Sequence, residues 1–162
     1  MERADFSGAR PVGDLVAAAA AEYGVEEDAD ELGRCAMTAL RSDIMQRAAR
    51  AERLLREVPF AVRVEERIVE GRIDLLFEEG GRWHLVDYKT DDPAGVGSAR
   101  ADSYRLQAGL YARALEQLGI PCSGVALYFV RSDTLTAIDY SSGLRAEAER
   151  LIQEAGLTRD DA

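Results

Sequence analysis

Hydrophobic and polar residues recur with two different periods along the chain, and the change of period separates a helical part from a mainly β part. In residues 13–23 and 27–56, apolar and charged residues recur at helical spacing, which predicts helices. Pro59 ends this pattern, and residues 60–69 carry β-branched side chains in rough alternation, which predicts a strand. The first third of the chain is therefore expected to be helical.

The rest of the chain predicts further strands around one long helix. Residues 72–78 and 82–90 have strand patterns on either side of Gly80-Gly81, a dipeptide suited to a two-residue hairpin turn because both positions need positive φ. Residues 91–97 hold a proline and two glycines and predict a loop, and a helix follows from Ser98 to about residue 118. Strands at 124–131 and 134–140 and a closing helix at 144–154 complete the pattern.

This order of elements indicates an α/β fold. The long helix joins the third strand to one that can lie parallel to it, and a right-handed crossover then gives a mixed β-sheet flanked by helices. The length and the 47% hydrophobic content are typical of one domain with its own core. Within a single domain over 1–162, we expect flexible residues at 1–12, a helical part at 13–56, the sheet and crossover helix at 57–140, and a closing helix within 142–156.

Composition excludes several classes of protein. No apolar run approaches the roughly 20 residues that span a bilayer, and the amino terminus lacks a secretory pattern, so no membrane association and a cytoplasmic location are expected. Cys35 and Cys122 lie far apart without CxxC spacing, which argues against a disulfide framework, a zinc site or an iron–sulfur cluster. Both are expected to be small core residues.

The charge distribution argues against strong nucleic-acid binding by the chain alone. The formal net charge is −10, and an acidic protein is repelled by a polyphosphate backbone. The charge is uneven, because the charged residues among 22–31 are all acidic, whereas residues 41–72 are rich in arginine. The arginines at multiples of three would form a drifting basic stripe on the predicted helix, a pattern most typical of a solvated face: Arg41, Arg47, Arg50, Arg53 and Arg56.

The predicted hairpin brings two aspartates together. With Gly80 and Gly81 as its loop, Asp74 lies directly across from Asp87. The other pairs follow from the same register, with Leu76–Leu85 and Arg72–Lys89 on the aspartate face and the apolar pairs Ile73–Tyr88, Leu75–Val86 and Phe77–His84 on the other.

Two opposed carboxylates repel one another unless a cation or a shared proton intervenes. A hard divalent ion such as Mg²⁺ prefers carboxylate oxygens, so Asp74 and Asp87 are candidate metal ligands. Lys89 emerges on the same face, where its ammonium can orient an attacking water or stabilise charge on a phosphate. The alternative is that the aspartates are exposed strand residues and Lys89 forms a surface ion pair with one of them.

Three motifs in this order resemble the PD-(D/E)xK nuclease superfamily, and most closely the nuclease domain of RecB/AddA-type helicase–nucleases: Gly71-Arg-Ile-Asp74, Asp87-Tyr-Lys89 and Gln107-Ala-Gly-Leu-Tyr111. The resemblance implies a restriction-endonuclease-like sheet in which Asp74, Asp87 and the carbonyl of Tyr88 bind Mg²⁺, or Mn²⁺ in its place, and Lys89 is catalytic. It also implies a loose match of Glu57 to an upstream glutamate near the metal.

By the same resemblance, Gln107 and Tyr111 line the DNA path. The alternative is that Tyr111 is a core residue and Gln107 its polar edge.

The chain departs from the family at one ligand. Many relatives carry a histidine on their first helix, whereas the only histidine here is His84, which faces Phe77 and is expected at the edge of the core. A site with fewer ligands and weaker metal affinity would follow. Relatives with an iron–sulfur cluster need four cysteines, so none is expected in this chain.

The sequence therefore predicts a Mg²⁺-dependent DNA nuclease that hydrolyses phosphodiester bonds with a metal-activated water. The resemblance implies an exonuclease acting on DNA ends or single strands in recombination and repair, as part of a helicase or beside one that supplies DNA affinity. One alternative is a catalytically silent nuclease-like module for DNA processing or scaffolding. Another is an unrelated metal-dependent hydrolase of other substrates.

Overall fold

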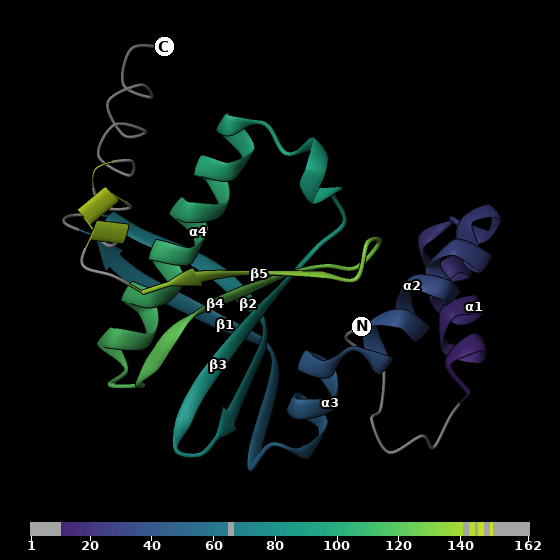
Figure 1. The fold of residues 1–162 in the computed structure, drawn as a ribbon, viewed down its shortest axis with the longest axis horizontal. Helices are drawn as coiled ribbons and strands as arrows, with labels where there is room; N and C mark the ends of the chain where they lie inside the picture. The colour runs from purple at the N-terminus through teal and green to yellow at the C-terminus, as the bar shows by residue number, and fades with distance from the viewer. Residues whose placement is uncertain (1–10, 65–66, 141–142, 145, 148–149, 151–162) are drawn as a thin grey trace.

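Three helices precede the sheet in the computed structural model, which describes residues 11–64, 67–140, 143–144, 146–147 and 150 (Figure 1). They are α1 (Val12–Tyr23), α2 (Ala29–Arg41) and α3 (Asp43–Arg50), with a short 3-10 turn, η1 (Glu26–Asp28), between the first two. Gly24 ends α1 in the left-handed conformation with φ of 67°. The helical amino-terminal part is thus confirmed up to Arg50.

The remaining elements build one five-stranded sheet. Its strands are β1 (Arg53–Val64), β2 (Arg67–Glu79), β3 (Arg82–Lys89), β4 (Cys122–Phe129) and β5 (Thr134–Asp139). They lie in the sheet in chain order, and all neighbours are antiparallel except β3 and β4. The parallel pair is joined through η2 (Pro93–Gly95) and the long helix α4 (Ser98–Gln117), which confirms the predicted mixed sheet and crossover (Figure 1).

Two predictions for the first strand were wrong. The helical pattern does not continue to Arg56, because β1 already begins at Arg53. Pro59 lies inside this strand, where its missing N–H is tolerated because β1 is at the edge of the sheet. The single strand expected over residues 60–69 consists of the end of β1 and the start of β2. The predicted closing helix falls largely outside the described residues.

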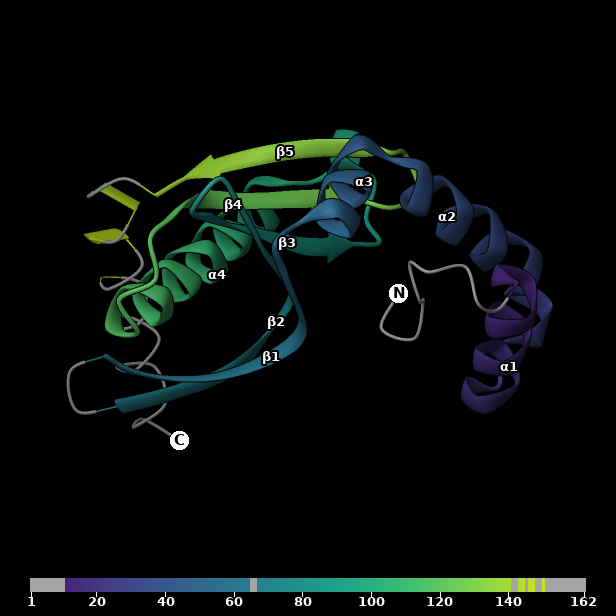
Figure 2. The same cartoon turned by 90° about the horizontal axis from the view of Figure 1, so that it is seen from below.

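Both faces of the sheet are covered, although the sequence pattern indicated only one fully apolar face. Helix α4 packs on the face that carries Leu76 and Leu85 (Figure 2). Helices α2 and α3 supply Ala39, Ile44 and Met45 to a second cluster on the face of Leu75, Phe77 and Val86. A polar side chain of the first face near α4 is therefore enclosed by protein and needs a partner there.

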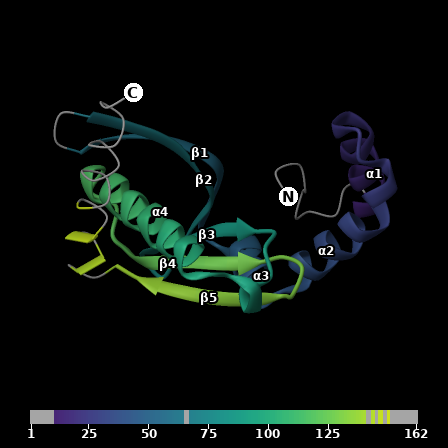
Figure 3. The ribbon, with the colours of Figure 1, turned by 90° about the horizontal axis from the view of Figure 1, so that it is seen from above.

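The β2–β3 register agrees with the prediction from Gly80-Gly81, from Glu79↔Arg82 to Leu75↔Val86. The ladder ends there, so the predicted pair of Asp74 and Asp87 does not form, nor do the pairs predicted for Ile73 and Arg72. Ile73 packs in the cluster of Leu76 instead of on the predicted face. The β1–β2 ladder is also interrupted at this level, between Arg56↔Leu75 and Val58↔Ile73, where Glu57 has a φ of 50°. Figure 3 shows the β1–β2 hairpin curving away from β3, β4 and β5. Asp74 thus lies where the ladders on both sides of β2 are interrupted.

The helices contain no membrane-spanning candidate. None of those in the described part of the chain combines the length and the apolar character that crossing a bilayer requires.

Candidate active site

Asp87 is the buried centre of the site. It lies near the carboxyl end of β3, and only 2% of the residue is exposed. The Tyr111 hydroxyl, from α4, donates to Asp87 Oδ1 at 2.9 Å and also lies 3.2 Å from the Arg72 carbonyl oxygen. Burial raises the pKa of Tyr111, and the negative charge of Asp87 raises it further. Tyr111 therefore stays a hydrogen-bond donor to the carboxylate.

Lys89 completes a closed polar circuit with residues of β3 and α4. Its ammonium forms an ion pair with Asp87 Oδ2 and donates to Gln107 Oε1 at 2.7 Å. Gln107 Nε2 in turn donates to the Tyr111 hydroxyl at 2.8 Å. The Lys89 side chain is 12% exposed, so this is not the surface ion pair of the alternative interpretation. The two motif residues on α4 orient the two charged residues of the strand.

Asp74 occupies the place where the ladders separate. The Tyr88 backbone N–H donates to its Oδ2 at 2.8 Å, a bond that takes the place of ladder pairing. Burial raises the pKa of Asp74 despite this bond, and the nearby charges of Asp87 and Glu57 raise it further. Glu57 is therefore close enough to act on the site, and its carboxylate lies 3.6 Å from the Arg72 guanidinium. The charged form of Asp74 is therefore disfavoured at this position.

This donor set fits a hard divalent cation. Apart from its ion pair with Lys89, the buried Asp87 Oδ2 accepts no hydrogen bond from the described residues, and burial, together with the charges of Asp87 and Glu57, raises the pKa of Asp74. Oxygen donors of this kind suit Mg²⁺ or Mn²⁺ better than softer metals. Over the described residues, however, no three His, Cys, Asp or Glu side chains form a ready-made metal cluster. Main-chain oxygen or water would then have to complete the coordination of a bound ion.

Gly71 has a packing role beside the site. A Cβ atom on Gly71 would lie 2.6 Å from the ring of Phe60 on β1, so only glycine leaves room for that ring. Phe60 in turn meets Tyr111 edge-to-face, with ring centroids 5.6 Å apart. The glycine of the first motif therefore supports the tyrosine that holds Asp87.

His84 lies away from the site, as predicted. Its ring stacks on Phe77 with centroids 5.0 Å apart and lies 3.8 Å from Glu79. Cys35 and Cys122 do not form a disulfide with each other, and each is only half-buried rather than fully within the core. Neither residue type contributes to the carboxylate site.

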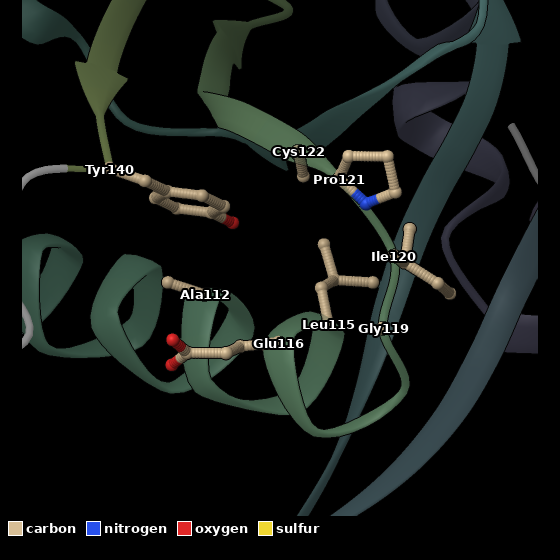
Figure 4. Close-up of a pocket in the computed structure, with 8 residues that line it drawn as sticks. All are labelled: Ala112, Leu115, Glu116, Gly119, Ile120, Pro121, Cys122 and Tyr140. Carbon is tan, nitrogen blue, oxygen red and sulfur yellow. The ribbon is translucent and has the colours of Figure 1, made fainter.

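A separate cavity of about 300 Å³ lies at the opposite end of α4, beside Leu115, Cys122 and Tyr140 (Figure 4). Cys122 pairs with Trp83, at the amino end of β3, whereas Asp87 and Lys89 are at its carboxyl end. The Tyr140 hydroxyl points into this cavity and is one of the buried polar atoms that the described residues leave without a hydrogen bond. The residues that line the cavity include none of the motif residues, although burial and, less strongly, the negative charge of Asp87 raise the pKa of Tyr140.

Two features of the site escaped the sequence interpretation. Tyr104 places its ring next to the Lys89 ammonium, 4.5 Å from centroid to Nζ, but an aromatic residue three positions before Gln107 on a helix is ordinarily a core residue. The second feature is that Lys89 is the only lysine in the sequence, since all other basic residues besides His84 are arginines. The single lysine is thus placed at the one position where the motif requires it.

A match over nearly the whole chain identifies its family. The model of the PD-(D/E)XK nuclease superfamily matches residues 7–162, and the chain belongs to this superfamily. Members of the superfamily generally use divalent metal ions. The fold agrees, because the chain superposes with a TM-score of 0.52 on a solved structure from Eubacterium rectale that carries a provisional exonuclease assignment. That alignment covers 92% of this chain and 66% of the other at 12% identity, and it shows the fold alone.

Curated relatives narrow the likeness to one group within the superfamily. The chain is 36% identical over 111 residues to a subunit of the ATP-dependent helicase/nuclease from Heliobacterium modesticaldum, an alignment that covers 56% of this chain and 8% of the relative. It is 33% identical over 115 residues to the protein of the same name from Staphylococcus haemolyticus, covering 58% and 9%. The chain therefore corresponds to a small part of these relatives.

Proposed function

We propose that this chain is a metal-dependent DNA nuclease domain that hydrolyses phosphodiester bonds. Asp74, Asp87 and the main-chain carbonyl of Tyr88 would hold Mg²⁺, with Glu57 close enough to take part directly or through water. The observation that carries the proposal is the buried circuit of Asp87, Lys89, Gln107 and Tyr111, in which one carboxylate oxygen has the Lys89 ion pair but no hydrogen bond from the described residues. Removing these charged groups from water costs desolvation free energy, so a contribution to stability alone does not explain the circuit.

Each residue of this chain has a definite task in the proposed reaction. When bound, the cation would polarise the phosphate and lower the pKa of a water molecule. Tyr111 holds the Asp87 carboxylate in one orientation, and Gln107 holds the Lys89 ammonium beside it. Lys89 would position the attacking water and stabilise the charge that develops on the phosphate. Gln107, which is part-buried, would also line the path of the DNA strand. Tyr111 is only 2% exposed and packs in the core, as in the alternative interpretation, so it would act through its hydrogen bonds with Asp87 and Gln107.

We further propose that the domain acts as an exonuclease on DNA ends or single strands, together with a helicase. The names of the relatives join helicase and nuclease in one protein. A net charge of −10 favours the same arrangement, because a motor that binds DNA would supply the affinity that an acidic domain lacks. Recombination and repair are the processes in which such an activity would be used.

The test is cleavage of end-labelled single- and double-stranded DNA with Mg²⁺, Mn²⁺ or EDTA. Metal-dependent cleavage is expected from the native protein and is expected to disappear in Asp87→Asn and Lys89→Ala. The matched controls are Asp139→Asn, an exposed aspartate on β5, and Arg82→Ala, an exposed cation at the start of β3, both of which should cleave normally.

A second candidate function is a silent nuclease-like module. It is favoured by the absence of a three-ligand side-chain cluster in the described part of the chain. A folded protein that cleaves no DNA with either metal, alone or with a helicase, would support this candidate and overturn the first.

A further inference from the structure

Tyr104 makes a contact with Lys89 that the proposed nuclease mechanism has not used. Its ring faces the ammonium, with 4.5 Å between the ring centroid and Nζ. We propose that Tyr104 is a positioning residue that keeps the Lys89 ammonium at the reacting phosphate while the Asp87 carboxylate is engaged by a divalent cation. This inference rests on the proposed function.

The ring of Tyr104 is held from both ends. Its hydroxyl donates to Asp91 Oδ2, and Arg100 binds the same carboxylate through Nη2 at 2.6 Å and Nε at 3.1 Å. The ring also packs edge-to-face on Phe129, with centroids 6.2 Å apart, and the residue is only 8% exposed. The ring is therefore a fixed surface rather than a side chain that happens to pass near the lysine.

Lys89 needs an uncharged partner when a divalent cation binds at Asp87. Its ion pair uses Asp87 Oδ2, an oxygen that a divalent ion would also seek. Competition for that oxygen leaves Lys89 with the Gln107 carbonyl oxygen at 2.7 Å and the Tyr104 ring. An aromatic face attracts an ammonium without carrying a full charge, so it neither binds the divalent ion strongly nor neutralises the lysine. The ammonium then remains available to water and phosphate.

The contact can be measured without any activity, because Lys89 is the only lysine. Protein grown with lysine ¹³C-labelled at Cε gives one side-chain signal, whose protons should be shifted upfield by the ring current of Tyr104. The shift should persist with Mg²⁺ present and in Tyr104→Phe, which keeps the ring. It should disappear in Tyr104→Leu. An unshifted signal in the native protein would overturn the proposal, even if no variant of Tyr104 could be folded.

Kinetic measurements then distinguish a positioning role of Tyr104 from a purely structural one. In Tyr104→Leu we expect kcat to fall about tenfold, the size of one desolvated cation–π contact, with KM for DNA and the affinity for Mn²⁺ unchanged. Tyr104→Phe should restore most of kcat. Tyr23→Leu, the same change at a tyrosine that is 71% exposed on α1, is the control and should behave as the native protein.

The remaining outcomes are also decisive. Equal losses in Tyr104→Phe and Tyr104→Leu would assign the effect to the Asp91 hydrogen bond and overturn the role of the ring. Unchanged kcat in Tyr104→Leu would overturn it as well. A native protein that cleaves nothing would refute the proposed function, whereas the ring-current measurement would still decide whether Tyr104 holds Lys89.

Discussion

The β2–β3 hairpin carries a cluster of acidic and basic residues at each end, and the two clusters differ in exposure. At the turn, Glu79 binds Arg47 at 2.6 Å and lies 3.8 Å from His84, with the Glu79 and Arg47 side chains 44% and 36% exposed. At the other end, Asp87 and Lys89 form an ion pair with side chains 2% and 12% exposed. The hairpin therefore has one carboxylate, Glu79, in an exposed pair with Arg47 of α3, and another, Asp87, in a pair inside the protein.

The pKa shifts of the two clusters have opposite signs. At the turn, the hydrogen bond from Arg47 lowers the pKa of Glu79, so the protein supplies the charge that this carboxylate needs. At the site, burial and the neighbouring carboxylates raise the pKa of Asp74. The turn cluster thus stabilises the charged form of its carboxylate, whereas burial and neighbouring negative charges disfavour the charged form of Asp74 at the site. A buried cluster of this kind is a functional feature more than a stabilising one.

The largest expected difference between the clusters is in catalysis. Lys89→Met should lower the rate of DNA cleavage by about 10²- to 10³-fold or more, because a preorganised charge at the reacting phosphate is lost. Arg47→Met, which removes the cation of the turn cluster, should leave the rate unchanged. Single-turnover cleavage at saturating Mg²⁺ measures both. Similar losses in the two variants would remove the functional distinction between the clusters.

The two ends of the hairpin should also differ in stability. Lys89→Met should lower the free energy of unfolding by about 3 kcal/mol, because the buried Asp87 carboxylate loses its counter-charge. Adding Asp87→Asn should recover most of this loss, since the uncompensated charge is then gone. Urea unfolding in EDTA checks the pair. A double variant no more stable than Lys89→Met would show that the carboxylate is not the source of the penalty.

Metal binding should stabilise the folded protein, and this effect should depend on the site cluster and not on the turn cluster. At a Mg²⁺ concentration about 100 times its dissociation constant, binding to the folded state alone adds about 2.7 kcal/mol, which raises the melting temperature. EDTA should reverse the rise and Asp74→Asn should abolish it, whereas Glu79→Gln should retain it. Thermal unfolding with and without Mg²⁺ is sufficient. A full rise in Asp74→Asn would place the ion elsewhere.

The smallest expected effect is a pH dependence at the turn. Burial and the charge of Arg47 lower the pKa of His84 below its ordinary value of 6.5. Between the two values the unfolded chain binds more protons than the folded one, so stability from His84 is present above pH 6.5 and is lost as the pH falls through the folded pKa. His84→Gln should therefore lose less stability than the native protein between pH 7 and pH 5 in urea titrations. Equal losses of stability in the variant and the native protein would contradict the lowered pKa of His84.

The sequence was most informative where local chemistry determines geometry. Gly80-Gly81 sets the register of β2 and β3, and the order of motifs leads to Asp87, Lys89, Gln107 and Tyr111, which the structure brings together. Periodicity alone was misleading at Arg53 and Arg56, because arginines three residues apart resemble a helix face even when they lie on an edge strand.

Other parts of the site depend on contacts that no local pattern contains. The ladder ends before Asp74 because the Tyr88 N–H bonds to the aspartate side chain, an arrangement that forms only where the two strands separate. The ring of Tyr104 meets Lys89 through the packing of α4 on the sheet, and spacing along the helix does not reveal which side chain it will contact. Tertiary packing determines both the end of the β2–β3 ladder and the contact between Tyr104 and Lys89.

The chain order of the strands has a consequence for how the protein acquires its activity. The strands β1 to β5 lie in the sheet in chain order, so each strand after β1 pairs with the strand that precedes it. The connection between β3 and β4 is the long one, because it contains α4. All the proposed catalytic groups fall between Glu57 and Tyr111. During synthesis, this uninterrupted stretch is therefore complete before β5 is made, and its site contacts span 14 to 24 residues along the chain.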